Sequence, residues 1–148
     1  MTKRIAIDAS VFIAKFIPEE PHHEISQKFI EAVIQSGVQI MIPVWTLFEV
    51  LHAYYRRSDG ALEKTDGIYK NFIEWNLTRQ IRFVNMEADF LVYFTAHHHR
   101  FSLKTADSVV ALNAHRLKCP LITWDKKLIN SIKGRVEAMT PEKFLQKN

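Results

Sequence analysis

The chain has 148 residues, of which 47% are hydrophobic and 24% are charged. This balance excludes extensive disorder, and the length fits one domain that spans residues 1–148. Lysine and arginine exceed aspartate and glutamate by 20 to 16, which gives a net charge of +4. Such a mild basic excess is compatible both with simple solubility and with a polyanionic partner such as nucleic acid.

The cysteine content and the hydrophobic runs bear on where the protein works. Cys119 is the only cysteine, so the chain cannot form an internal disulfide, and a reducing cytosol is favoured. Because it precedes Pro120 at the start of a predicted strand, it is expected to be a buried structural residue. No apolar run reaches the ~18–20 residues of a membrane span, and 5–7 is too short for the core of a signal peptide. We expect a cytoplasmic protein with no membrane attachment.

The first half of the chain alternates short β-branched runs with segments of helical periodicity. The predicted elements are a strand at 4–7, a helix at 11–16, a helix between Pro21 and Gly37, a strand at 38–42, and helices at 44–57 and 62–77. In the helix at 44–57 the predicted core stripe is Val44, Leu47, Phe48, Leu51 and Tyr55, and a second face carries Trp45, Glu49, His52 and Arg56. In the helix at 62–77 the predicted inward residues are Leu62, Tyr69, Phe72 and Ile73.

The second half continues the alternation. It is predicted to contain a strand at 81–84, helices at 87–99 and 105–117, a strand at 121–124, a short helix at 126–132, a strand or edge segment at 136–139 and a terminal helix from Thr140. Strands that alternate with helices indicate an α/β fold with a mostly parallel sheet of four to five strands and helices on both faces. Right-handed crossovers then place the carboxyl ends of the first and fourth strands side by side.

Four short strings each put one carboxylate at the edge of an apolar element. They are Ile5-Ala6-Ile7-Asp8-Ala9-Ser10, Phe48-Glu49-Val50, Thr105-Ala106-Asp107-Ser108 and Ile122-Thr123-Trp124-Asp125. Asp8 and Asp125 follow the two adjacent strand ends, where open α/β sheets form their ligand crevice. Asp107 begins the helix that leads into the fourth strand, and Glu49 lies one turn into the helix that leaves the second. We therefore expect all four acids at one rim.

Carboxylates gathered in this way attract a cation. Two unit charges ~4 Å apart repel by about 4 kcal/mol at an effective dielectric constant near 20, so such a cluster protonates in part or binds a metal. Oxygen ligands without cysteine or paired histidine favour Mg²⁺ or Mn²⁺. We expect one or two ions held by Asp8, Glu49, Asp107 and Asp125, with Ser10 and Thr123 as supporting hydroxyls.

Such a metal site suits the hydrolysis of phosphodiesters, because a bound ion lowers the pKa of water and stabilises the leaving oxygen. The basic residues near the acids then have a use: Arg56, Lys126 and Lys127 are expected to hold phosphates. Trp45 or Trp124 is expected to stack on a base.

Each of these residues also has a purely structural interpretation. A single aspartate is more often a helix cap or a surface charge than a ligand, so the hypothesis depends on the four acids together. The three histidines at 97–99 point about 100° apart on a helix and are interpreted as a helix end favoured by the dipole. His52 is interpreted as a partly buried structural residue.

The four strings resemble the PIN-domain family of metal-dependent ribonucleases, and the chain is similar in length to its compact toxin-type (VapC-like) members. Asp8-Ala9-Ser10 matches the opening Asp-x-Ser/Asn motif, Glu49 the acid after the second strand, Thr105-Ala106-Asp107 the third acid, and Thr123-Trp124-Asp125 the closing Thr/Ser-x-Asp. The resemblance covers essentially the whole chain.

This resemblance implies a three-layer α/β/α sandwich, Mg²⁺ or Mn²⁺ in the acidic pocket and endonuclease activity on RNA. It also implies a homodimer and a small antitoxin protein that covers a groove and often inserts a basic side chain among the acids. The position of Asp125 varies within the family, and Glu63, Glu87 and Asp89 are other helical acids that compete with Glu49 for the second position.

Three alternatives remain beside the toxin hypothesis. A haloacid-dehalogenase-type phosphatase also places an aspartate after its first strand, but it needs a second one two residues later, where this chain has Ser10. A stand-alone RNA-processing PIN nuclease would carry the same acids. An inert PIN-like module that binds RNA or protein would be expected to lack some of them.

Overall fold

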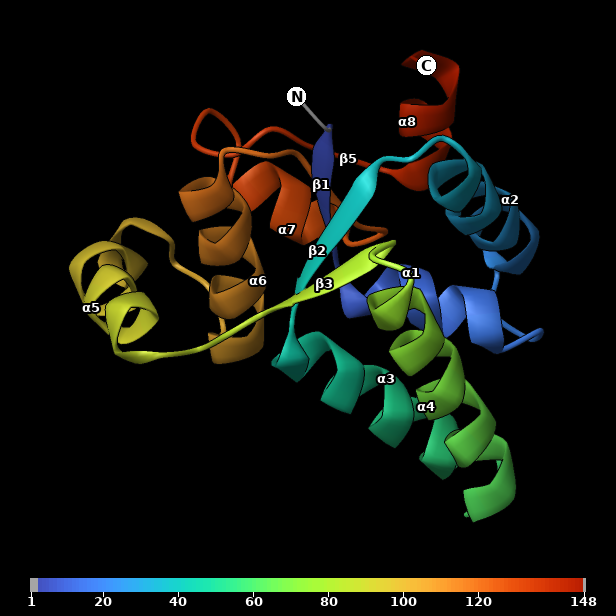
Figure 1. The fold of residues 1–148 in the computed structure, drawn as a ribbon. Coiled ribbons are helices and arrows are strands. Elements are labelled where there is room, and N and C mark those ends of the chain that lie inside the picture. The colour runs from blue at the N-terminus through green and yellow to red at the C-terminus, as the bar shows by residue number, and fades with distance from the viewer. Residues whose placement is uncertain (1–2, 148) are drawn as a thin grey trace.

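β1 lies at the centre of a five-stranded parallel sheet with the order β3-β2-β1-β4-β5 in the computed structural model, which describes residues 3–147 (Figure 1). The strands are β1 Arg4–Ile7, β2 Gln39–Pro43, β3 Ile81–Val84, β4 Leu121–Ile122 and β5 Ala138–Met139. The prediction of a parallel sheet with the first and fourth strands adjacent is confirmed. β4 and β5 are each two residues shorter than predicted.

The helices cover both faces of this sheet. They are α1 Ala9–Phe16, α2 His23–Gln35, α3 Val44–Arg57, α4 Leu62–Leu77, α5 Ala88–His97, α6 Thr105–Leu117, α7 Lys126–Ser131 and α8 Pro141–Lys147, with a 3₁₀ turn η1 at His98–Arg100. The predicted bounds of the helices at 62–77 and 105–117 are confirmed. In α2, for example, Phe29, Ile30 and Val33 form an apolar stripe that is buried.

Alternate residues of β1 pack into two different cores, which makes the fold three-layered. Ile5 and Ile7 point into a core shared with α1 to α4 and α8, and Ala6 points into a second core shared with α6 and α7. Successive side chains of a strand point to opposite faces, so a strand that is apolar at every position has to be covered on both. All three residues are completely buried, and the α/β/α sandwich follows.

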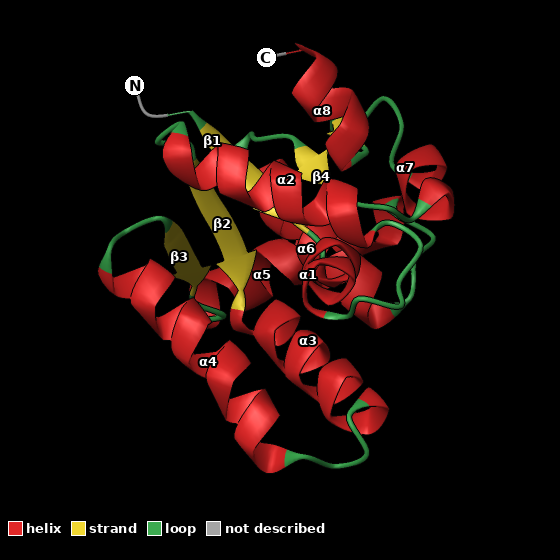
Figure 2. Cartoon of the chain, turned by 90° about the vertical axis from the view of Figure 1, so that its right-hand side faces the viewer, coloured by secondary structure: helices red, strands yellow, loops and turns green. Residues whose placement is uncertain are grey.

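Two predicted core stripes are correct only in part: Leu47 of α3 and Phe72 of α4 are buried as predicted, and other members are not. On α3 the buried residues are Thr46, Leu47 and Val50, whereas Phe48 is 58% exposed. Tyr55 is exposed as well. The reason lies in the packing of α3 and α4, which run side by side and extend away from the sheet (Figure 2). Towards the far end of this pair there is no sheet to bury a stripe.

The same arrangement explains α4. Ile68 and Phe72 are buried, as expected for Phe72, but Leu62 is 71% exposed and Tyr69 is also exposed. Leu62 begins α4 at the end remote from the sheet. Exposed apolar side chains on both helices leave a surface that the chain itself does not cover.

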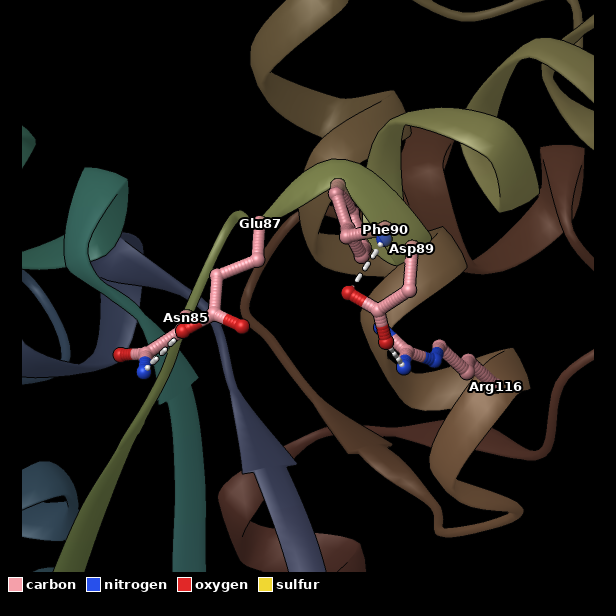
Figure 3. A network of polar contacts seen from close by, with 5 residues as sticks. All are labelled: Asn85, Glu87, Asp89, Phe90 and Arg116. Atoms are coloured by element: carbon pink, nitrogen blue, oxygen red, sulfur yellow. Dashed lines mark hydrogen bonds and ion pairs between the residues drawn. The ribbon is translucent and has the colours of Figure 1, made fainter.

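Polar contacts fasten α5 to α6. The carboxylate of Asp89 forms an ion pair with Arg116 and also accepts a hydrogen bond from the backbone N–H of Phe90 at 2.8 Å (Figure 3). At the other end of α5, Nδ1 of His97 and Nδ1 of His98 lie 2.8 and 3.0 Å from the carbonyl oxygens of Tyr93 and Phe94. These histidines therefore contact carbonyl oxygens of the last turn of the helix. This agrees with the prediction that they form a helix end favoured by the dipole.

Cys119 is buried, as predicted, and burial raises the pKa of its thiol to about 11. It is therefore a structural residue and not a nucleophile. Between residues 3 and 147, no helix combines the length and the apolar character that crossing a membrane requires.

Candidate active site

Asp8 stands where β1 ends and α1 begins. It is the N-cap of α1, and its Oδ2 accepts hydrogen bonds from the backbone N–H of Ser10 at 3.3 Å and from Oγ1 of Thr123 at 2.9 Å. Its own backbone N–H donates to the carbonyl oxygen of Ile122 at 2.9 Å. Strand pairing and a side-chain contact thus both tie this carboxylate to the end of β4.

Thr123 is the centre of the polar contacts at this edge. It is completely buried, its Oγ1 lies 3.3 Å from Oγ of Ser10, and it accepts a hydrogen bond from the backbone N–H of Asp125 at 3.0 Å. Oγ of Ser10 accepts from the backbone N–H of Trp124 at 3.1 Å. The two predicted supporting hydroxyls therefore fix the segment that carries Asp8 against the segment that carries Asp125.

Asp125 combines two positions, because it sits beside this network and also caps a helix. Its Oδ1 accepts from the backbone N–H groups of Lys127 and Leu128 at 2.8 and 3.0 Å, which makes it the N-cap of α7. The side chain is exposed. A carboxylate has further lone pairs beyond those used by a cap, so Asp125 can accept further contacts.

Glu49 and Asp107 complete the group, and electrostatics shows that they lie near the others. The pKa of Glu49 is raised to about 7, first by burial and then by the charges of Asp8 and Asp107. The pKa of Asp107 is also raised, by burial first and then by Asp8 and Asp125. Each of the four acids is thus coupled to at least one other, as expected for like charges sharing one edge. These couplings place Glu49 near Asp8 and Asp107, and Asp107 near Asp125.

The arrangement suits a divalent cation in its chemistry but is not a closed metal cage. Carboxylate oxygens are the ligands that Mg²⁺ and Mn²⁺ prefer. The pKa of Glu49 is raised first by burial and then by the charges of Asp8 and Asp107, and a cation would relieve that second effect. Within residues 3–147, no three His, Cys, Asp or Glu side chains already lie close enough to hold a common ion. Mg²⁺ commonly keeps several waters and takes only one or two carboxylates directly, so the donor set fits the metal with part of the shell left to water.

The predicted phosphate-binding residues are exposed, at different distances from the acids. Lys126 and Lys127 open α7 directly after Asp125. Arg56 lies two turns beyond Glu49 near the end of α3, next to Arg57, which is ion-paired with Glu20. The lysines are therefore immediate neighbours of the acidic edge, and Arg56 belongs to its outer margin.

The two tryptophans behave differently from each other. Nε1 of Trp124 donates to Oγ of the buried Ser26 at 2.8 Å, and its ring stacks on His22 with ring centroids 3.9 Å apart. This contradicts the expectation that Trp124 stacks on a base, because the ring already packs within the protein. Trp45 is 43% exposed and remains accessible. His52, interpreted as partly buried, is exposed.

Two contacts at the site were missed by sequence reasoning. The side chain of Trp45 donates a hydrogen bond to Glu49, which lowers the pKa of that carboxyl against the larger effects that raise it. The charge of Lys104 likewise lowers the pKa of Asp107. Sequence spacing could have predicted both contacts. Trp45 stands four residues before Glu49 on one helix face, and Lys104 directly precedes α6, which carries Asp107.

The edge that carries the acids lies within the part of the chain that matches a known family. Residues 5–133 match the model of the PIN domain. A search of curated protein sequences found no match.

Solved structures share the fold. VapBC from Salmonella typhimurium, solved bound to DNA, superposes with a TM-score of 0.69 at 13% identity over 95% of this chain and 99% of that one. VapBC2 from Rickettsia felis, bound to a DNA fragment from its promoter, gives a TM-score of 0.66 at 13% identity over 93% and 98%. VapC20 from Mycobacterium tuberculosis, a sarcin–ricin loop cleaving toxin, gives 0.65 at 16% identity over 90% and 97%. With the family match over most of its length, and the acids on the carboxyl edge of this sheet, the chain belongs to the PIN domain family.

Proposed function

We propose that the protein is a metal-dependent endoribonuclease that hydrolyses RNA phosphodiester bonds, and that it is the toxin component of a toxin–antitoxin pair. The observation that carries the proposal is that Glu49 and Asp107, at one edge of a PIN-domain sheet, have pKa values raised by burial and further by the charge of Asp8. PIN domains generally use divalent metal ions, and partly buried acids whose pKa values are raised further by a neighbouring carboxylate are favourably placed for one.

In this proposal Asp8, Glu49 and Asp107 hold Mg²⁺ or Mn²⁺, one ion or two, and Asp125 joins directly or through water. When bound, the metal lowers the pKa of water to supply the nucleophile and stabilises the leaving oxygen. The oxygens of Asp8 are held in place by the N–H of Ser10 and the hydroxyl of Thr123.

The chain's own charges bind and position the RNA. Lys126 and Lys127 next to Asp125, and Arg56 farther along α3, hold phosphates on either side of the acids. Lys104, whose charge already acts on Asp107, adds a fourth cation at the α6 side. Trp45 offers an exposed ring beside Glu49 on which a base stacks.

We propose that a small antitoxin docks on the surface between α3 and α4. A groove there is lined by Leu51, Leu62 and Tyr69, and a second one beside it by Phe48 and others. Exposed apolar patches of this kind mark interaction sites. Because Phe48 precedes Glu49 on α3, a partner seated on this surface lies within reach of the acids. The VapBC structures that share the fold support a partner of this class.

The remaining parts of the proposal concern assembly and location. We propose a homodimer, which light scattering of the purified protein tests directly. A cytoplasmic setting is consistent with the single buried and reduced Cys119.

The central test is RNA cleavage by purified protein in Mg²⁺ or Mn²⁺, with sequencing of newly formed RNA ends. Wild type is expected to cleave, chelation by EDTA to stop cleavage, and Asp8→Asn and Asp107→Asn to abolish it while the circular dichroism spectrum is unchanged. Asp66→Asn on α4, paired with Lys70, is the matched control and should cleave normally. Wild type that binds RNA without cutting it would indicate an inert module. Cleavage without any antitoxin partner on co-expression with the neighbouring gene would indicate a stand-alone processing nuclease.

A further inference from the structure

The packing of α5 on α6 depends on polar and aromatic side chains more than on apolar burial. Figure 1 shows α5 on the outer side of α6. Among the residues of α5, all of which the structure describes, only Phe90 is buried. An element that buries little apolar surface opens at a lower free energy than the core of the protein. The polar contacts of α5 therefore decide how firmly this helix is held.

His115 of α6 is the centre of these contacts. Its Nδ1 is hydrogen-bonded to the hydroxyl group of Tyr93 on α5. The centroid of its ring lies 6.1 Å from that of His97 and 6.0 Å from that of Phe101. The ring of His97 in turn stacks on Tyr93, with the centroids 4.1 Å apart and the planes 19° apart. Two imidazoles and one phenol thus join α5 to α6.

Arg100, in the 3₁₀ turn that follows α5, adds a positive charge beside these rings. The pKa of His115 is lowered by burial first and then by the charges of His97 and Arg100. In Tyr93 burial raises the pKa of the phenol, and the charges of Arg100 and Arg116 oppose this effect. Each of these cations disfavours a further positive charge on His115.

The other charged groups at this contact do not offset the cations. The carboxylate of Asp89 on α5 is already ion-paired with Arg116 of α6 (Figure 3). On another side of His115, the guanidinium group of Arg135 lies 5.6 Å from the centre of the Phe101 ring, which meets His115 edge-on. A proton added to His115 therefore enters a group of like charges whose carboxylate is already occupied.

The two remaining histidines of this segment face other groups. Nδ1 of His98 lies 3.0 Å from the carbonyl oxygen of Phe94, and its ring stacks on that of Phe94 with centroids 5.3 Å apart. His99 is exposed, and its ring meets His98 edge-on. His99 is therefore a matched control for the titration of His115.

Protonation also changes the hydrogen bond between the two helices. A neutral imidazole can accept at Nδ1 from the hydroxyl group of Tyr93, whereas an imidazolium carries a hydrogen on both nitrogens and can only donate. Nδ1 of His97 lies 2.8 Å from the carbonyl oxygen of Tyr93. Because a carbonyl oxygen only accepts, this nitrogen carries a hydrogen and a further proton adds at Nε2. Acid thus converts two neutral rings at the same contact into two cations.

We propose that the contact formed by Tyr93, His97, Arg100 and His115 is an acid-sensitive switch, in which protonation of the two histidines loosens α5 from α6. The sheet and α6 remain folded, because α6 buries its own apolar residues, including Ala111 and Leu112, in the core that it shares with α7.

The segment that is loosened leads directly to the candidate active site. It runs from α5 through the 3₁₀ turn to Lys104, whose charge lowers the pKa of Asp107 against the larger effects that raise it. The switch is nevertheless a property of the α5–α6 contact and does not depend on the proposed nuclease activity.

The direction of the effect follows from the pKa of His115. Folding lowers this pKa below its ordinary value of 6.5, so the opened segment takes up the proton more readily than the closed one. The stabilising contribution of the neutral ring is fully present above pH 6.5 and is lost as the pH falls below that value.

Hydrogen–deuterium exchange of the full chain in EDTA tests the switch at pH 7.5 and pH 5.5. Rates in peptides from α5 are divided by the intrinsic exchange rate at each pH, which leaves the opening equilibrium. Opening is expected to increase by about threefold or more at the lower pH, because a like charge about 6 Å away in water favours separation by about that factor. Peptides from β1 and α6 should keep their protection.

Two variants remove one charge each. His115→Gln keeps a polar side chain that cannot be protonated, so the increase at pH 5.5 should be lost. Arg100→Gln changes an exposed side chain that the fold should tolerate. It should reduce the increase and raise the midpoint of the His115 titration measured by NMR. Arg82→Gln, exposed on β3, should leave both unchanged.

Tyr93→Phe separates the hydrogen bond from the charges. It removes the hydroxyl group and keeps both imidazoles, so α5 should open more at both pH values while the increase at pH 5.5 is retained. His99→Gln and Glu49→Gln should behave like wild type, since neither changes the contact. The proposal is overturned if α5 in wild type is equally protected at both pH values, or if His115→Gln shows the same increase as wild type.

Discussion

Oγ1 of Thr123 donates a hydrogen bond of 2.9 Å to Oδ2 of Asp8, across a sequence separation of 115 residues. The same hydroxyl oxygen accepts from the backbone N–H of Asp125 at 3.0 Å. One buried side chain therefore sets the positions of two acids that different ends of the chain supply. Few other contacts at this edge have so direct a bearing on the geometry of the pocket.

Thr123→Val keeps the shape of the side chain and removes both hydrogen bonds. We expect the free energy of unfolding to fall by about 1–3 kcal/mol, because a backbone N–H and a carboxylate oxygen lose a buried partner. RNA cleavage is expected to fall by about tenfold or more, since Asp8 loses its orientation. Urea unfolding and single-turnover cleavage measure the two effects. Thr95→Val, on an exposed part of α5, should change stability by no more than about 0.5 kcal/mol, and an equally small change in Thr123→Val would contradict the role of the hydroxyl.

The metal-free protein should lose stability as the pH rises through the acid range. The pKa of Glu49 is raised from 4.5 to about 7 in the folded state. Between these values the unfolded chain releases this proton while the folded chain keeps it, so the free energy of unfolding falls with rising pH and levels off above about 7. The contribution is fully present below pH 4.5. The raised pKa of Asp107 acts in the same direction.

Glu49→Gln removes this pH dependence. Because Glu49 is only half-buried and solvent screens its charge, we expect the variant to be more stable than wild type at pH 8 by about 1 kcal/mol, or about 2–4 °C in Tm. The difference should shrink towards pH 4.5. Differential scanning calorimetry in EDTA, with Glu63→Gln of α4 as the matched control, checks both statements. A Glu49→Gln variant that is less stable than wild type at pH 8 would contradict the crowding of the acids.

A divalent metal ion should offset the repulsion among the carboxylates and so stabilise the folded protein. Millimolar Mn²⁺ is expected to raise the Tm of wild type at pH 8, since a ligand that binds only the folded state at 100 times its Kd stabilises it by about 2.7 kcal/mol. Asp8→Asn and Asp107→Asn should show a reduced shift or none, and Asp66→Asn the full shift. This readout does not depend on cleavage, so it separates loss of metal from loss of catalysis. Equal shifts in all four proteins would rule out the acidic edge as the metal site.

Arg56 should contribute to RNA binding and not to metal binding. Arg56→Ala is expected to weaken the binding of single-stranded RNA and to reduce the salt dependence of that binding, because one phosphate contact is lost. Its Mn²⁺ affinity should be that of wild type. Fluorescence anisotropy with Lys70→Ala as a control, whose lysine is already paired with Asp66, measures the difference. RNA affinity that is the same in Arg56→Ala and wild type would remove Arg56 from the proposed path.

The surface between α3 and α4 should be needed for the antitoxin alone. Leu62→Ser replaces a side chain that is 71% exposed, so the fold should tolerate it, while the apolar contact with a partner is lost. We expect the variant to cleave RNA normally and to fail to co-purify with the protein encoded by the neighbouring gene. Leu91→Ser, which is exposed on α5, should co-purify. If Leu62→Ser still co-purifies with the partner, the proposed docking surface between α3 and α4 is wrong.

The fold was predictable because its determinants are local and periodic. Short β-branched runs such as Ile5 to Ile7 can only be strands covered on both faces, and the handedness of crossovers then puts β1 beside β4. The expectation that Asp8 and Asp125 share an edge follows from that topology. It required no knowledge of the intervening helices.

The contacts that sequence reasoning did not find depend on how helices are rotated about their axes. On α3 an apolar residue occurs on nearly every face, so the pattern does not decide whether Phe48 or Val50 is buried, and only packing against α1 and α4 does. Trp124 presents the same difficulty: that its ring is held by Ser26 and His22 is a tertiary fact. The hydrogen bond from Trp45 to Glu49 was within reach, because their spacing places them on one face.

β1 pairs with β4 in a register that sets Ala6 beside Leu121. This pairing also determines when the site can form during synthesis on the ribosome. A growing chain contains Asp8 from its earliest moments, yet the partner that orients it is among the last segments to emerge. Fragments released before that segment is made lack the assembled pocket. On the proposed function, nuclease activity is thereby withheld until synthesis is nearly finished.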